Sequence, residues 1–157
     1  MTEHGPDASP ASDRFQPGTP LETPSRRITV AEIEEFAHLT GDENPLHVDE
    51  EAARRGLFGG RVAHGLLTLS FTLGLWYRAG LFEGHTVVFS GIDRLRFLRP
   101  VRPGETLVAR LTVTQRSPSS RGEIVDLDNT TYNEKDEPVL SFTARLLLAA
   151  PVGKPSG

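Results

Sequence analysis

The chain has 157 residues, a length that fits one domain with one hydrophobic core. Its formal charge is -4, from 17 Lys and Arg against 21 Asp and Glu, so it offers no basic surface for nucleic acid. There are no cysteines, which excludes disulfides, thiolate nucleophiles and cysteine-ligated metals.

The first twenty residues lack the basic and apolar regions of a secretory signal. No uninterrupted apolar run approaches the roughly 18 residues that a membrane span needs. We therefore expect a cytoplasmic protein with no membrane partner.

The two ends of the chain differ in composition from its middle. Residues 1–25 are rich in proline, Ser, Thr, Gly and Asp and poor in large apolar residues, so they cannot offset their ordering entropy by burial. They predict a disordered tail, and residues 151–157 predict a shorter flexible one. The folded domain is expected over residues 26–150.

Two short helices are predicted first. Thr29 and Glu32 have the spacing of a capping box, and apolar residues then recur with helical period up to Gly41. Pro45 prevents this helix from continuing, because the residue before a proline avoids the helical region. A second helix is expected from a cap at Asp49 to Gly56.

The second half of the domain predicts a buried helix and then a sheet. Residues 64–79 are apolar on almost every face, so we expect this helix to be buried all round. The apolar period then changes to two, which predicts strands over 86–97, 107–114, 123–132 and 139–148. An α+β fold with the antiparallel sheet curled around the helix accounts for this order; a two-layer sandwich is the alternative.

The densest group of reactive side chains surrounds the turn at Pro45. Asp42 and His47 stand at its two ends, and Asn44 and Pro45 fix it, so both side chains could point into one cleft. A carboxylate beside an imidazole can orient a water, take its proton and return a proton to a substrate carbon. The simpler interpretation is that Asp42 caps the turn and His47 is a buried, hydrogen-bonded histidine.

His64 and Gly65 open the apolar helix. Free backbone N–H groups at a helix start can bind an anion or a developing oxyanion. Gly65 would let a carbonyl approach closely, although close packing of helix on sheet explains a glycine equally well. We expect His64 to bond to a neighbouring carbonyl and assign it no proton transfer.

A metal site is a further alternative. His47, Asp49 and His64 imitate the two-histidine, one-carboxylate set of non-haem iron oxygenases. Against it, His64 would open a buried helix and Asp49 serves better as a helix cap.

Two segments resemble a known family. The run GDENPLHVDEEAARRGLFGGRVAHGLLTLS is similar to the hydratase motif of the MaoC-like, (R)-specific enoyl-CoA hydratases, and FLRPV with GETL resembles the pattern that follows in them. The likeness covers about residues 28–148. It implies a single hotdog domain, usually paired into a homodimer or larger homo-oligomer, which reversibly hydrates a trans-2-enoyl-CoA to the (R)-3-hydroxyacyl-CoA. No metal or redox cofactor is implied; coenzyme A belongs to the substrate.

The resemblance also implies roles for residues. Asp42 and His47 would activate the water, and the Gly65 N–H would polarise the thioester carbonyl. Asn44 would support the loop; with Arg61 and His64 it forms the expected substrate-binding set. Arg94, Arg96 and Arg99 are further candidates for contacting coenzyme A, or else surface residues.

One position departs from the family. A serine that supports the catalytic pair is expected further along the helix, where this chain has Leu73, with Ser70 or Thr72 as substitutes. A thioesterase with the same fold, or a non-catalytic subunit that binds acyl thioesters, is the alternative function.

Overall fold

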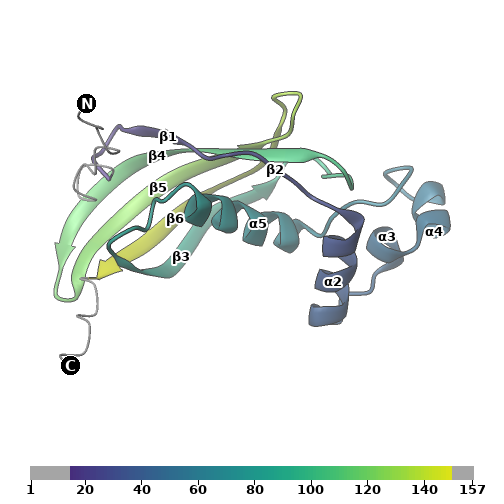
Figure 1. Cartoon of the computed structure of the whole chain (residues 1–157), viewed down its shortest axis with the longest axis horizontal. Helices are drawn as coiled ribbons and strands as arrows, with labels where there is room; N and C mark the ends of the chain where they lie inside the picture. Colours follow the sequence, from purple (N-terminus) through teal and green to yellow (C-terminus); the bar gives the residue numbers. More distant parts are fainter. Residues whose placement is uncertain (1–14, 150–157) are drawn as a thin grey trace, which may run out of the picture.

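The structure, a computed structural model, describes residues 15–149. Within these residues, four helices precede or pack against a curved antiparallel sheet of six strands (Figure 1). The helices are α2 (Val30–Thr40), α3 (Pro45–Val48), α4 (Glu50–Arg55) and α5 (Gly65–Arg78). The strands are β1 (Pro20–Glu22), β2 (Arg26–Arg27), β3 (Thr86–Phe97), β4 (Thr106–Ser119), β5 (Gly122–Tyr132) and β6 (Pro138–Ala149).

The strand order is β1-β4-β5-β6-β3, and β2 also pairs with β4. Among the described residues β3 is therefore an edge strand, hydrogen-bonded to β6 alone. Figure 1 shows α5 lying against the concave side of the sheet. This is the α+β fold that the sequence pattern predicted, in the hotdog arrangement that the family resemblance implied.

The core forms between α5 and the inward-facing residues of the sheet. The ring of Trp76 stacks on Phe142, with centroids 5.6 Å apart, and its Nε1 donates to Asn129 Oδ1 at 3.0 Å. One turn earlier, the hydroxyls of Thr72 and Thr131 lie 2.9 Å apart. Helix and sheet are thus joined by paired polar groups inside an apolar core, which fixes their register.

The predicted helix starts and strands are confirmed. Thr29 and Glu32 form a complete capping box, and Gly41 ends α2 with φ 77°, where glycine carries no steric penalty. The Asp49 carboxylate accepts from Ala52 N and so caps α4. The sequence did not predict α3, which Asn44 caps and which Pro45 starts in the first-turn position that suits proline.

The predicted disordered tail is wrong for residues 15–25. Phe15 is fully buried, β1 pairs with β4, and Thr23 exchanges two hydrogen bonds with Ala109. Backbone pairing to a neighbouring strand orders this segment despite its prolines, because Pro20 lies on an edge strand that needs few donors. Residues 1–14 and the predicted tail at 151–157 lie outside the described residues.

The expectation that α5 is buried all round is also wrong. Leu66 is 59% exposed and Tyr77 is 73% exposed, and Ser70 and Gly74 lie on the same face. The sheet covers one side of the helix and leaves a stripe of it open. Within residues 15–149, no helix is long and apolar enough to cross a membrane.

Candidate active site

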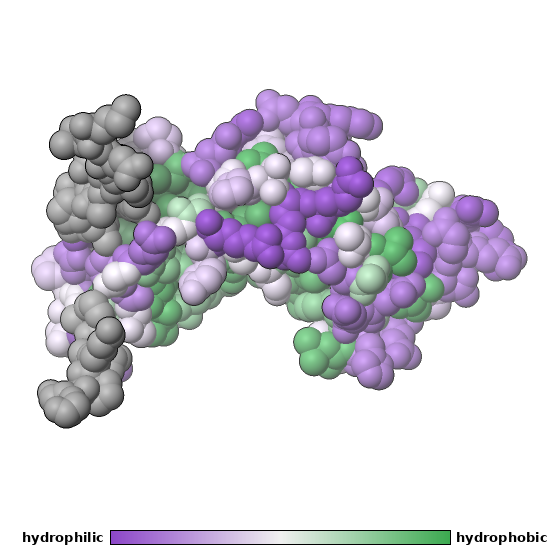
Figure 2. Space-filling model, in the orientation of Figure 1, coloured by the Kyte–Doolittle hydropathy of each residue, from purple (hydrophilic) through white to green (hydrophobic). Residues whose placement is uncertain are grey.

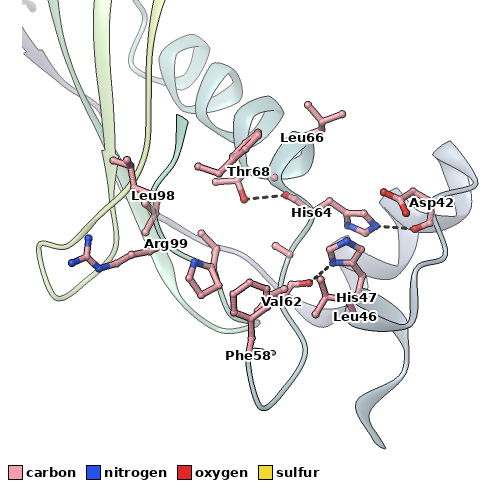
Figure 3. Close-up of a pocket in the computed structure, with 16 residues that line it drawn as sticks. Asp42, Leu46, His47, Phe58, Val62, His64, Leu66, Thr68, Leu98 and Arg99 are labelled. Carbon is pink, nitrogen blue, oxygen red and sulfur yellow. Dashed lines mark hydrogen bonds between the residues drawn. The ribbon is translucent and has the colours of Figure 1, made fainter. Parts of the chain in front are cut away.

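A cavity of about 420 Å³ opens where α5 begins (Figure 3). Its walls come from the loop after α2, from α3, from the segment before α5 and from the chain after β3. Most of its lining side chains are apolar: Leu46, Phe58, Val62, Ala63, Leu66, Phe97, Leu98, Pro100, Val101 and Val139. The polar ones are Asp42, His47, His64, Thr68 and Arg99. An apolar cavity with a few convergent polar groups is typical of a site for a small molecule with an apolar part.

The turn at Pro45 positions His47. Asn44 Oδ1 accepts from Leu46 N at 3.1 Å, and this cap starts the short helix that carries the histidine. The imidazole is buried, and its Nδ1 donates to the Val62 carbonyl at 2.7 Å. A carbonyl only accepts, so Nδ1 carries the hydrogen and Nε2 of the neutral ring keeps a lone pair. His47 is therefore oriented as a base.

Asp42 follows directly after the glycine that ends α2. Its side chain is exposed and lines the cavity, and no residue in the described part of the chain hydrogen-bonds to its carboxylate. The carboxylate therefore does not cap the turn, which was the simpler interpretation of this residue. It is free to bind water or substrate.

His64 links the two residues. Its Nε2 donates to the Asp42 carbonyl at 3.0 Å, as expected, and its ring stacks on His47 with centroids 3.8 Å apart. One ligand atom from each of Asp42, His47 and His64 lies within 4.8 Å of the other two. Figure 3 shows the three side chains side by side near the N-terminus of α5.

Gly65 is the first residue of α5 and lines the same cavity. Its N–H donates to no acceptor within residues 15–149, since it belongs to the unpaired first turn of the helix. A Cβ at this position would lie 2.8–2.9 Å from three ring carbons of Phe97. The glycine therefore permits close packing against an aromatic ring, which was the alternative explanation, and it leaves a backbone donor at the cavity wall.

Arg61 does not line the cavity, so its expected role in substrate binding does not fit the structure. The guanidinium Nε donates to the His47 carbonyl at 2.7 Å, and NH2 binds Glu34 at 3.1 Å. The side chain is only 10% exposed. Arg61 holds the backbone of the histidine rather than a ligand. Asn44, likewise, acts as a helix cap and is absent from the lining.

The other arginines divide between the sheet and the cavity. Arg94 binds Asp128 and Thr143 on the sheet, and Arg96 donates to the carbonyl of Leu95. Arg99 alone of these lines the cavity, and its NH1 donates to the Pro138 carbonyl at 3.1 Å. Of the arginines considered for contact with coenzyme A, it is the one in the wall of the cavity.

The hydroxyl at the cavity comes from a residue that the sequence analysis missed. Leu73, Ser70 and Thr72 do not line the cavity; the two hydroxyls donate to helix carbonyls one turn back. Thr68 lines it instead, and its hydroxyl donates to the His64 carbonyl at 3.2 Å. Its position three residues after Gly65, on the same face of the helix, is the signal that could have identified it.

Comparison with known proteins identifies the family of this chain. The family model for the MaoC-like domain matches residues 14–135, and the chain belongs to that family. It is 40% identical over 105 residues to Protein MaoC of Klebsiella aerogenes, covering 67% of this chain and 31% of that protein. It is 33% identical over 97 residues to an (R)-specific enoyl-CoA hydratase of Rhodospirillum rubrum, covering 62% of this chain and 65% of that one.

Solved structures share the fold. The crystal structure of a MaoC-like dehydratase from Rhodospirillum rubrum superposes with a TM-score of 0.78 at 32% identity, covering 89% of this chain and 97% of the other. The matched segment spans 31% of Protein MaoC and 65% of the enoyl-CoA hydratase, less than two thirds of either relative. Relatives of this chain include proteins named as hydratases and dehydratases.

Proposed function

We propose that this protein reversibly adds water to a trans-2-enoyl-CoA and forms the (R)-3-hydroxyacyl-CoA. One observation carries the proposal: His47, Asp42 and the free Gly65 N–H converge on one largely apolar cavity. The name of the Rhodospirillum rubrum relative supports the (R) configuration and the coenzyme A carrier.

The proposed reaction assigns a step to each group. His47 Nε2 and the Asp42 carboxylate hold one water molecule, and the water oxygen attacks C3 of the substrate as its proton passes to His47. The electron pair of the double bond moves onto the thioester oxygen, which accepts a hydrogen bond from Gly65 N–H. A proton then returns from the pair to C2. An oxyanion donor of this kind contributes about 2.7–4 kcal/mol to such a step.

The lining of the cavity suits both chemical parts of this substrate. Apolar side chains, among them Phe58, Leu98 and Val139, suit an acyl chain, and we assign Arg99, also in the lining, to a phosphate of coenzyme A. We propose no metal or redox cofactor, since proton transfer and an amide donor supply all that hydration needs. Treatment with a chelator should therefore not lower the rate.

The experiment that tests this function follows the loss of enoyl-thioester absorbance with 2-enoyl-CoA substrates of short, medium and branched chains. Free thiol is measured in the same samples. Hydration without thiol release supports the proposal. Thiol release identifies a thioesterase instead, and saturable binding without either reaction identifies a non-catalytic subunit.

We also propose that the protein is a homodimer. Large apolar side chains are exposed on α5 and on the edge strand β3: Leu66, Tyr77, Val88, Phe89 and Phe97. In Figure 2 hydrophobic residues appear between hydrophilic ones along the middle of the molecule, where Figure 1 places these two elements. An edge strand with apolar side chains is suited to pairing with another chain.

Light scattering coupled to size exclusion measures the mass in solution. We expect twice the chain mass of 17.2 kDa, and a shift to the monomer for Phe89→Glu. A monomer at every concentration of the unmodified chain would contradict the proposal.

A further inference from the structure

We propose that Asp42, His47 and His64 form a binding site for one Zn²⁺ ion, whose occupation blocks the hydration proposed above. The inhibitory part of this inference rests on that function; the metal site itself does not. The site comprises two imidazoles and one carboxylate with a ligand atom of each within 4.8 Å of the others. It differs from the metal set considered from the sequence, because Asp49 is engaged as the cap of α4 and Asp42 takes its place.

The two histidines are oriented as metal ligands usually are. A histidine that binds a metal almost always donates its other ring N–H to a carbonyl or carboxylate, which fixes the tautomer and the ring plane. His47 donates from Nδ1 to the Val62 carbonyl, and His64 donates from Nε2 to the Asp42 carbonyl. Each ring therefore has its remaining nitrogen available as a lone-pair donor.

A second observation, independent of the cluster, points to a missing ligand. His64 is 2% exposed, and its Nδ1 is the one buried side-chain nitrogen or oxygen in the described part of the chain that has no hydrogen-bond partner. Buried polar atoms are nearly always paired, because an unpaired one retains its full desolvation cost. Coordination to a metal ion would satisfy this nitrogen.

The chemistry of the donors selects the ion. Two imidazole nitrogens and one carboxylate favour zinc over calcium or magnesium, which prefer oxygen ligands. Tetrahedral zinc with bonds of about 2.0–2.1 Å needs donors roughly 3.4 Å apart, so ligand atoms that lie within 4.8 Å of one another must approach by at most about 1.4 Å. The exposed Asp42 side chain can rotate toward the ion, and one of the two stacked imidazole rings, whose planes lie 28° apart, must tilt so that the lone pairs of both converge on it.

The local charge also favours a divalent cation. The three ligands carry one negative charge when the imidazoles are neutral, and the nearest arginine behind His47 is already paired with Glu34. A bound zinc would take the His47 lone pair and the Asp42 carboxylate, the two groups that must hold the water. Occupation of the site therefore removes the base of the proposed reaction.

The test measures zinc binding without substrate. Untagged protein is treated with a chelator, dialysed, and titrated with zinc chloride by calorimetry and by competition with a chromophoric chelator. We expect one Zn²⁺ per chain in the micromolar range, and at least about tenfold weaker binding for Asp42→Asn and for His64→Phe. Because the Asp42 side chain is exposed, Asp42→Asn retains the fold even if His64→Phe does not.

Two matched variants serve as controls. Glu43→Gln removes the exposed carboxylate next to Asp42, and His38→Ala removes an exposed histidine on α2. Both should bind zinc as the unmodified chain does. The site is overturned if no zinc binds, if Asp42→Asn binds with unchanged affinity, or if either control weakens binding.

Activity is then measured on the same chelator-treated protein. Hydration that falls in proportion to zinc occupancy, and returns with chelator, supports the inhibitory role. Zinc binding to a protein that shows no hydration before zinc is added supports the metal site and contradicts the proposed function. Full activity at saturating zinc overturns the inhibition.

Discussion

The imidazole rings of His47 and His64 stack with their centroids 3.8 Å apart and their planes 28° apart. His64 at the same time donates a hydrogen bond to the backbone of Asp42. One buried side chain thus positions both members of the proposed acid–base pair, through an aromatic contact on one side and a hydrogen bond on the other.

Two substitutions of His64 separate these contacts. His64→Gln can keep the donor to the Asp42 carbonyl and loses the ring, whereas His64→Phe keeps the stacking and loses the donor. We expect each to lower kcat by about tenfold to a hundredfold, because small displacements of reacting groups are costly. Steady-state kinetics check this, and a change confined to KM would contradict a positioning role.

The close packing of Gly65 against the Phe97 ring gives a second prediction. In Gly65→Ala the new Cβ must displace the Phe97 ring, since it would lie 2.8–2.9 Å from three ring carbons. Phe97 is 51% exposed, so its ring can move, and the displaced ring changes the cavity beside the Gly65 amide. We expect kcat/KM to fall at least about tenfold.

The double variant Gly65→Ala with Phe97→Ala shows whether the ring is the cause. If it is, the double variant recovers most of the activity lost in Gly65→Ala, measured against Phe97→Ala alone. Activity that stays as low as in the single Gly65→Ala variant would mean that the methyl group itself obstructs the substrate.

Arg61 and Arg99 are expected to affect different kinetic constants. Arg61→Met removes the hydrogen bond to the His47 carbonyl, so kcat should fall by about tenfold while KM for the thioester stays the same. Arg99→Ala should instead raise KM, and raise it more at low ionic strength, because Arg99 lines the cavity. A KM effect of Arg61→Met would restore the substrate-binding role that the sequence suggested.

Stability toward acid should depend on Asp126. Two hydrogen bonds from Arg145 hold the pKa of Asp126 below its ordinary value near 3.8. The unfolded chain takes up this proton at a higher pH than the folded one, so the stabilisation is present above the ordinary value and is lost as pH falls through the lowered one. Asp126→Asn should therefore lower Tm at pH 7, and its difference from the unmodified chain should shrink in acid.

Arg145→Met provides the matched comparison for that experiment. It should reproduce the same pH dependence, and the double variant should lose little more than either single one. Equal Tm differences at pH 7 and in strong acid would contradict the contribution of this ion pair.

The elements with local signals were predictable from the sequence. The capping box at Thr29, the left-handed glycine at 41 and the period-two strands depend on neighbours in the chain, and all appear in the structure. Asp42, His47, His64 and Gly65 were brought together by motif spacing, and the structure places all four at one cavity.

The features that the sequence did not predict depend on contacts between residues that are far apart in the chain. The sequence predicted disorder for residues 15–25, because the pairing with β4 that orders this segment involves residues about ninety positions away. The sequence suggested that Arg61 contacts the substrate. Its actual partners, Glu34 and the His47 carbonyl, come close to it only in the folded chain. Apolar residues on α5 indicated burial on all sides, although the sheet of one chain covers only one side of the helix.

The most direct test of the central claim is hydration of 2-enoyl-CoA by Asp42→Asn compared with Glu43→Gln, its neighbour with an equally exposed carboxylate. Removal of one partner of an acid–base pair should lower the rate by about 10²–10⁴-fold, so Asp42→Asn should lose nearly all activity and keep the Tm of the unmodified chain. Glu43→Gln should retain its rate within about twofold, since it lies outside the pair. An Asp42→Asn variant as active as Glu43→Gln would contradict the account.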